Sequence, residues 1–198
     1  GVSSIVPVLP AVMRELGVSA GSIGLLMTMF TLPGVLLTPV FGILADRLGR
    51  KKVLVPSLMA FGIFGTACAF VRSWELLLFF RFLQGSGAAA LGIINVTLIG
   101  DLYSGRERTS AMGYNASVLS MGTALYPAIG GGLAILGWNY PFMLPCIAII
   151  LGLVVIFKLE NPEPGEKPDL GNYFAGALAE LKQRQMVGLL LCTLITFI

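Results

Sequence analysis

The residues best suited to chemistry in this chain gather in one short polar segment. Residues 42–52, GILADRLGRKK, contain one acid and four bases, whereas only 12% of the chain is charged. Bases in a short loop are typical of the cytoplasmic side of a membrane protein. Asp46 needs another explanation, because acids contribute little to membrane orientation and this one opposes the negative end of its own helix dipole. An anchoring role leaves Gly42 and Gly49 unexplained as well.

A second candidate group lies inside an apolar segment that starts near Glu75. Arg81 is two helical turns into this segment, where a guanidinium costs at least ~2.5 kcal/mol unless it faces water or a partner. Gln84 continues the same helical face, and Asn95 returns to it further along the chain. The pattern predicts that this face lines a cavity. The alternative is that Arg81 extends to the outer membrane interface.

The following apolar segment also carries polar residues on one side. Asn115, Gly122 and Tyr126 fall on a single helical face, and we expect them to line a pocket.

Several other kinds of chemistry find no support. The sequence has no His, no GK[ST] phosphate loop and no cluster with metal-ligand spacing, so ATP hydrolysis and metal catalysis are not indicated. The net charge of +3 does not indicate nucleic acid, because the bases do not form a soluble face. We therefore predict a protein that is not an enzyme and has no cofactor and no metal.

The composition defines the elements that must position these residues. Hydrophobic residues make up 56% of the chain, and the mean hydropathy is +0.88, which indicates a membrane protein. Apolar segments of roughly 20 residues can each cross a ~30 Å hydrocarbon core. We predict such spans at 21–44, 53–71, 75–100, 109–133 and 138–157, with shorter apolar pieces at 1–13 and 186–198.

The loops between the spans give the topology. When alternate loops are assigned to alternate sides, the side rich in Lys and Arg is cytoplasmic. That side would hold Arg47, Arg50, Lys51, Lys52, Arg106, Arg108, Lys158, Lys167, Lys182 and Arg184. The outer side would hold Arg14 and Arg72.

The domain boundaries follow from the same pattern. We expect a transmembrane bundle over 1–157 with a truncated first helix. A cytoplasmic connector with a short amphipathic helix would follow over 158–185. The start of a seventh helix would occupy 186–198, with a second half of the protein beyond it.

An internal repeat suggests how the bundle is built. PVFGILADRLG from Pro39 and PAIGGGLAILG from Pro127 share Pro, Gly, Leu and Gly at a constant offset. This offset maps the second span onto the fifth, so that spans one to three would repeat as four to six. An odd number of spans per unit makes the two units inverted in the membrane.

The motifs resemble those of the major facilitator superfamily of secondary transporters. The signature loop between helices 2 and 3 of that family, G-x-L-a-D-r-x-G-r-k, is matched by Gly42, Leu44, Asp46, Arg47, Gly49, Arg50 and Lys51. Its helix-4 pattern, R-x-x-q-G-x-g-a-a, is matched by Arg81, Gln84, Gly85, Gly87, Ala88 and Ala89. The helix-5 pattern of its antiporters is matched by Gly122, Pro127, Gly130 and Gly131, with Tyr126 in place of the Gly before Pro.

The resemblance implies an all-α membrane fold, namely a six-helix N-terminal bundle of two inverted three-helix repeats plus the start of helix 7. In the family the turn at GDLYSGRER neighbours the signature loop, so Asp101 is expected to pair with Arg47 or Arg50. The implied conformational latch consists of Gly42, Asp46, Arg47, Gly49, Arg50 and Asp101. The implied cavity and coupling residues are Arg81, Gln84, Asn95, Asn115 and Tyr126.

The implied function is proton-coupled efflux of a drug-like or amphipathic compound, as in the drug/proton antiporter branch. Its partners would be a small-molecule substrate, protons, the lipid bilayer and the C-terminal half of the same protein. We expect a multi-pass protein of a bacterial or archaeal inner membrane. Two alternatives stay open: transport of a sugar or organic anion, for which Arg81 would be the counter-charge, and a non-transporting membrane scaffold or receptor.

Overall fold

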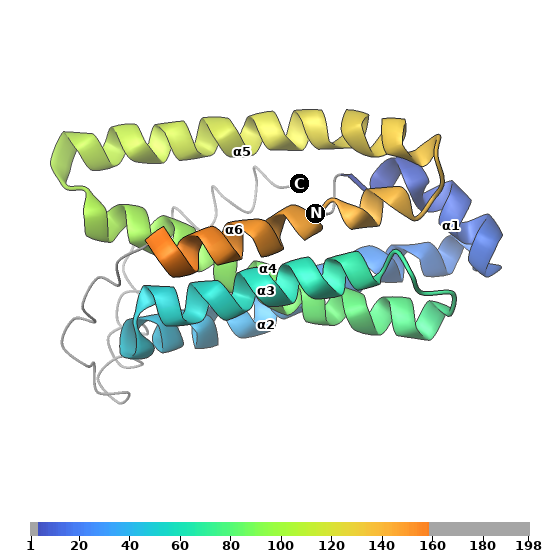
Figure 1. The fold of residues 1–198 in the computed structure, drawn as a ribbon, viewed down its shortest axis with the longest axis horizontal. Helices are drawn as coiled ribbons and strands as arrows, with labels where there is room; N and C mark the ends of the chain where they lie inside the picture. Colours follow the sequence, from blue (N-terminus) through green and yellow to red (C-terminus); the bar gives the residue numbers. More distant parts are fainter. Residues whose placement is uncertain (1–3, 159–198) are drawn as a thin grey trace, which may run out of the picture. The chain divides into compact units, whose positions relative to one another are not determined.

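The computed structural model describes residues 4–158, which are helical apart from short connections. The order of elements is η1 (Val6–Val8), α1 (Leu9–Leu16), α2 (Ala20–Leu48), α3 (Arg50–Ala67), α4 (Trp74–Leu102), α5 (Gly105–Ala134), η2 (Tyr140–Met143) and α6 (Cys146–Lys158). Figure 1 shows their arrangement. The connector predicted for 158–185, beyond Lys158 itself, and the helix start predicted for 186–198 lie outside the described residues.

Each predicted full span coincides with a helix, but not every helix is equally apolar. Three described segments are long and apolar enough to cross a membrane: Ala20–Leu48, Trp74–Leu102 and Tyr140–Lys158. Helix α3 is outside this set because three of its 18 residues are the cations of its first turn. Helix α5 is outside it because Gly, Ser and Thr are frequent along its length. The spans predicted at 53–71 and 109–133 overlap α3 and α5, and their crossing of the membrane stays a prediction.

The long helices run roughly along one common direction (Figure 1). The turns from α2 to α3 and from α4 to α5 lie at one end, together with the last turn of α6. The connections from α3 to α4 and from α5 to α6 lie at the other end. This alternation gathers the loop bases from Arg47 to Lys52 and from Arg106 to Arg108 at a single end, as the positive-inside rule requires.

Helix α4 occupies the central position in the packing. It contacts both α2 and α3 along much of its length, α3 packs on α6, and α5 contacts α4, η1 and η2. A Cβ atom added at Gly85 of α4 would overlap the carbonyl oxygen of Phe30 in α2. Small residues at such crossings let helix backbones approach closely and gain van der Waals contact. The two candidate groups, near Asp101 and Arg81, are thus both carried by the most tightly held helix.

Two apolar clusters fill the interior at opposite ends of the bundle. The larger one joins α2, α4 and the two short 3-10 helices, with Leu26, Leu77 and Phe142 among its buried members. The smaller one consists of Ala45, Val53, Ala90 and Ile94, from α2, α3 and α4. The smaller cluster lies at the basic end of the bundle, directly under the turn from α2 to α3.

The topology yields a labelling prediction. In the full-length protein, with its native cysteines replaced, Ser73→Cys should react with a membrane-impermeant maleimide added to intact cells. Arg106→Cys should react only after the membrane is opened. Both side chains are exposed; Ser73 directly precedes α4 and Arg106 lies in the first turn of α5, at opposite ends of the bundle. Labelling of Arg106→Cys but not of Ser73→Cys in intact cells would reverse the assigned orientation.

Candidate functional site

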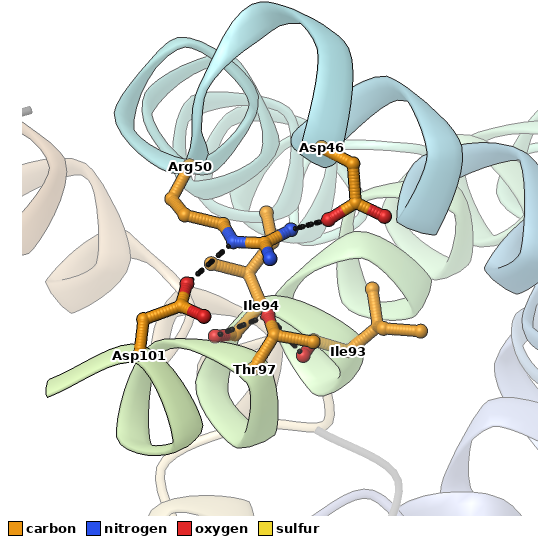
Figure 2. A network of polar contacts seen from close by, with 6 residues as sticks. All are labelled: Asp46, Arg50, Ile93, Ile94, Thr97 and Asp101. Atoms are coloured by element: carbon orange, nitrogen blue, oxygen red, sulfur yellow. Dashed lines mark hydrogen bonds and ion pairs between the residues drawn. The ribbon is translucent and has the colours of Figure 1, made fainter. Parts of the chain in front are cut away.

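Three charged side chains meet at the basic end of the bundle (Figure 2). We refer to Asp46, Arg50 and Asp101 as the salt-bridge cluster. The Arg50 guanidinium donates from Nε to Oδ2 of Asp101 at 2.9 Å and from Nη1 to Oδ1 of Asp46. Of the two pairings expected for Asp101, the structure has the one with Arg50. Three helices, α2, α3 and α4, are therefore joined through one guanidinium.

The turn from α2 to α3 sets the direction of Arg50. Gly49 alone separates the two helices, with φ of 94° and ψ of 145°. This positive φ is readily adopted only by glycine, so that the chain can end one helix and begin the next within a single residue. Asp46 in the last turn of α2 thereby faces Arg50 in the first turn of α3. The requirement for Gly49 in the predicted latch has a direct structural cause.

The salt-bridge cluster rests on the small apolar cluster of α2, α3 and α4. Ile94 is fully buried there, and Figure 2 shows it beneath the Arg50 side chain. Thr97 turns its hydroxyl back to its own helix, donating to the carbonyls of Ile93 at 3.0 Å and Ile94 at 3.2 Å. Gly42 is buried where α2 meets α4, and a Cβ added there would lie 3.4 Å from Cδ1 of Ile93. Arg47 is half-buried in the last turn of α2.

The three side chains of the salt-bridge cluster differ in their exposure to solvent. The side chains of Arg50 and Asp46 are 15% and 28% exposed, whereas that of Asp101 is 41% exposed. Burial lowers the pKa of Arg50, which lies outside the predicted span 53–71, but its hydrogen bonds to Asp101 and Asp46 outweigh this and raise the pKa above its ordinary value. The guanidinium therefore remains charged. Within the salt-bridge cluster itself, two carboxylates face one guanidinium, whereas the surrounding loop bases keep this end of the bundle positive overall.

The second group is buried in the opposite half of the bundle. Arg81 is 1% and Gln84 0% exposed, and Nη1 of Arg81 donates to Oε1 of Gln84 at 2.9 Å. The guanidinium carbon lies 5.6 Å from the ring centre of Phe30 and 4.9 Å from that of Phe142. Aromatic faces at these distances attract a cation.

This environment leaves part of the Arg81 and Gln84 hydrogen-bonding capacity unused. Within residues 4–158, Nε of Arg81 and Nε2 of Gln84 have no hydrogen-bond partner. The guanidinium contacts Gln84, Phe30 and Phe142 there, none of which is a carboxylate. The side chain is enclosed by protein in this part of the chain, in contrast to the interfacial position weighed from the sequence. Its predicted role in coupling stays a prediction.

The other predicted cavity residues lie apart from Arg81. Asn95 of α4 donates from Nδ2 to Oδ1 of Asn115 in α5 at 2.8 Å, which joins two helices that touch at few other places. Tyr126 is 43% exposed and lines a hollow of about 520 Å³ along α5, together with Gly122 and apolar side chains. The predicted residues thus form three separate groups in the described part of the chain.

The helix-5 motif has a packing explanation. Pro127 lies inside α5, which is continuous from Gly105 to Ala134. A Cβ at Gly130 would overlap the carbonyl oxygen of Ser4, and one at Gly131 would lie 3.8 Å from Cβ of Pro7. Gly130 therefore allows the segment before α1 to lie against α5, whereas at Gly131 a Cβ would make an ordinary van der Waals contact.

Sequence reasoning did not find two kinds of contact. The rings around Arg81 come from α2 and η2, far away in the sequence, and an aromatic residue in an apolar segment carries no signal of such a role. Lys51 donates from Nζ to the carbonyl oxygen of Ile156 in α6 at 2.7 Å, although its basic loop indicated only an anchor. Within the described residues, no three His, Cys, Asp or Glu side chains are grouped so as to hold a metal ion.

Comparison with known proteins gives a consistent result. Residues 1–198 match the Major Facilitator Superfamily. The chain is 35% identical over 149 residues to the bacillibactin exporter of Bacillus subtilis, a match that covers 72% of this chain and 37% of the exporter. It is 29% identical over 160 residues to the quinolone resistance protein NorA of Staphylococcus aureus, covering 79% of this chain and 41% of NorA.

A third relative has a similar identity and coverage. Multidrug resistance protein 1 of Bacillus subtilis is 29% identical over 164 residues, covering 82% of this chain and 42% of that protein. The chain spans less than half the length of these curated relatives.

The buried Arg81–Gln84 pair yields a stability prediction. Gln84→Leu removes the hydrogen-bond acceptor of a buried guanidinium and should destabilise the full-length protein by about 1.5–3 kcal/mol. The double variant Arg81→Met/Gln84→Leu replaces both partners by apolar groups of similar size and should recover most of this loss. Thermal unfolding in detergent measures both. A double variant no more stable than Gln84→Leu would mean that Arg81 depends on a partner other than Gln84.

Proposed function

The chain belongs to the Major Facilitator Superfamily, and from this premise we propose that the whole protein is a secondary active transporter that exports a drug-like or amphipathic molecule in exchange for protons. Its two halves would rock about a central site, each half built from two inverted three-helix repeats. The names of the relatives, an exporter and two resistance proteins, support the direction of transport. All of them are bacterial, which supports a bacterial cell membrane as its location.

The observation that carries this proposal is the salt-bridge cluster at the basic end of the bundle. One of its two carboxylates, that of Asp101, belongs to the most exposed of the three side chains. Because Arg50 and the apolar cluster below hold it in place, this charge is fixed in direction. A fixed anion of this kind suits the N-terminus of a helix, whose free N–H groups and dipole attract negative charge.

We therefore assign the salt-bridge cluster to conformational control. In this proposal Asp46, Arg50 and Asp101 bind a helix N-terminus of the C-terminal half while the transporter is open to the outside. The contact is broken when the cytoplasmic side opens. Gly42 and Gly49 position the two helices that carry the acid and the base, and Arg47 adds positive charge at the same surface.

The remaining predicted residues are assigned to the transport path. Arg81 and Gln84 would couple substrate movement to protonation, while Asn95, Asn115 and Tyr126 would line the path on α4 and α5. The five acids of the described residues, Glu15, Asp46, Glu75, Asp101 and Glu107, lie near helix ends. We therefore place the proton carrier in a part of the protein outside residues 4–158.

One observation favours a second candidate function. Arg81 has no carboxylate among its contacts in the described chain, so an anionic substrate could serve as its counter-charge. In that case the protein would transport an organic anion, or a sugar carrying an acidic group. Because Arg81 is only 1% exposed in this structure, such a substrate would contact the guanidinium in another conformation of the transporter.

Transport in proteoliposomes tests the function. Vesicles with an acidic lumen that contain the full-length protein should accumulate a fluorescent amphipathic cation when diluted into neutral buffer. The lumen should lose protons at the same time. An ionophore that removes the proton gradient should abolish both signals. Counterflow of organic anions without accumulation of the cation would favour the second candidate, and transport of neither would favour a non-transporting scaffold.

The conformational role of Asp46 yields a separate prediction. Removing a charge-assisted contact worth ~1.5–3 kcal/mol should shift the ratio of inward-open to outward-open states by about tenfold to a hundredfold. Asp46→Asn should thus slow transport and favour the inward-open state in spin-label distances across the two halves. The intrinsic substrate affinity of that state should be almost unchanged.

Glu107→Gln provides the matched control, since this exposed acid lies at the same end of the bundle but outside the salt-bridge cluster. It should leave the ratio of states unchanged. An unchanged ratio in Asp46→Asn together with a large loss of affinity would place Asp46 in the substrate site instead.

A further inference from the structure

Lys51 makes a contact that the proposed latch does not explain. Its Nζ donates to the carbonyl oxygen of Ile156 at 2.7 Å, although the two residues are 105 positions apart. The described part of α6 runs to Lys158, so the carbonyl of Ile156 belongs to its last described turn. Lys51 of α3 donates to this turn from a neighbouring helix.

The position of Lys51 is unfavourable for its own helix. Arg50 and Lys51 occupy the first turn of α3, where the helix dipole repels positive charge. The C-terminal ends of α2 and α4, which attract positive charge, lie at the same end of the bundle as the last described turn of α6 (Figure 1). Arg50 contacts Asp46 and Asp101 near the ends of α2 and α4, and Lys51 contacts the last described turn of α6.

We propose that Lys51 is a positioning residue that fixes the C-terminal end of α6 to the turn that carries the salt-bridge cluster. This inference rests on the proposed function in one respect, namely that the salt-bridge cluster changes its partner during transport. When it does so, the first turn of α3 moves and the last described turn of α6 follows. The sequence predicts the connector between the two halves from residue 158 onward, immediately after this end. Lys51 therefore links the latch to the start of the connector.

The neighbouring Lys52 provides a comparison within the same turn. It has the same charge and the same place in the basic loop, but its side chain is exposed, whereas that of Lys51 is half-buried. If the basic loop served only to anchor the protein at the membrane, the two lysines would be interchangeable. If the contact of Lys51 with Ile156 holds α6 in place, replacing Lys51 should change hydrogen exchange in α6, and replacing Lys52 should not.

Hydrogen exchange in the full-length protein measures the contact directly. Lys51→Gln should speed exchange of the amides in the last described turn of α6 by about two- to fivefold, as expected when one partly exposed hydrogen bond is lost. Lys52→Gln should leave these amides unchanged, and Lys51→Arg should retain most of the protection. Equal exchange in Lys51→Gln and Lys52→Gln would overturn the proposal.

A second arm tests the link to the salt-bridge cluster. Asp101→Asn should speed exchange at the end of α6 while Lys51 is present, and should add nothing in the Lys51→Gln background. Additive effects of the two changes would show that the end of α6 is independent of the salt-bridge cluster, which also contradicts the proposal.

Transport by the same variants separates this inference from the proposed function. Lys51→Gln should slow transport more than Lys52→Gln does, and equal rates would contradict a role in the cycle. Absence of transport in the unmodified protein would contradict the proposed function. The exchange measurements would still decide whether Lys51 joins α6 to the salt-bridge cluster.

Discussion

An ionised side chain in the hydrocarbon region of a membrane must find a partner or reach the interface with water. The charged side chains of residues 4–158 follow this constraint. The acids and most bases lie at or near helix ends, where loops meet at the two ends of the bundle. Arg81 is the exception, since it is buried within α4. It is tolerated there because Gln84 accepts one hydrogen bond and two aromatic faces lie against the guanidinium.

Helix α4 carries a charged residue of each kind, one buried and one at a helix end. It carries Arg81 near its outer end and Asp101 in its last turn, about 20 residues or about 30 Å apart along a helix. Backbone contacts at Gly85 with α2, and at Gly87, where an added Cβ would lie 2.7 Å from the carbonyl oxygen of Ser57 in α3, hinder sliding of α4. A shift at one end of α4 therefore carries α2 and α3 along, which suits a bundle that moves as one body.

The sequence predicted what depends on local pattern and missed what depends on how helices are rotated against one another. Apolar length located the helices, and the resemblance of residues 42–51 to a family motif brought Asp46 and Arg50 into the candidate site. The pairing of Arg50 with Asp101 depends on the backbone angles of Gly49, which turn α3 relative to α2. The rings around Arg81 and the contact of Lys51 with α6 depend on packing between distant segments, which a single sequence does not encode locally.

Arg50 and Lys51 are consecutive cations, and the side-chain chemistry of each suits the partners that it contacts. A guanidinium is a planar fork of five N–H donors, so that Arg50 can donate to two carboxylates from different helices at once. A lysine ammonium is a compact donor on a flexible stem, and Lys51 directs it to the carbonyl of Ile156 in α6. Because both side chains leave the same turn of α3, that turn is connected to the ends of α2, α4 and α6 together. A change at any one of the three ends therefore acts on the other two through the first turn of α3.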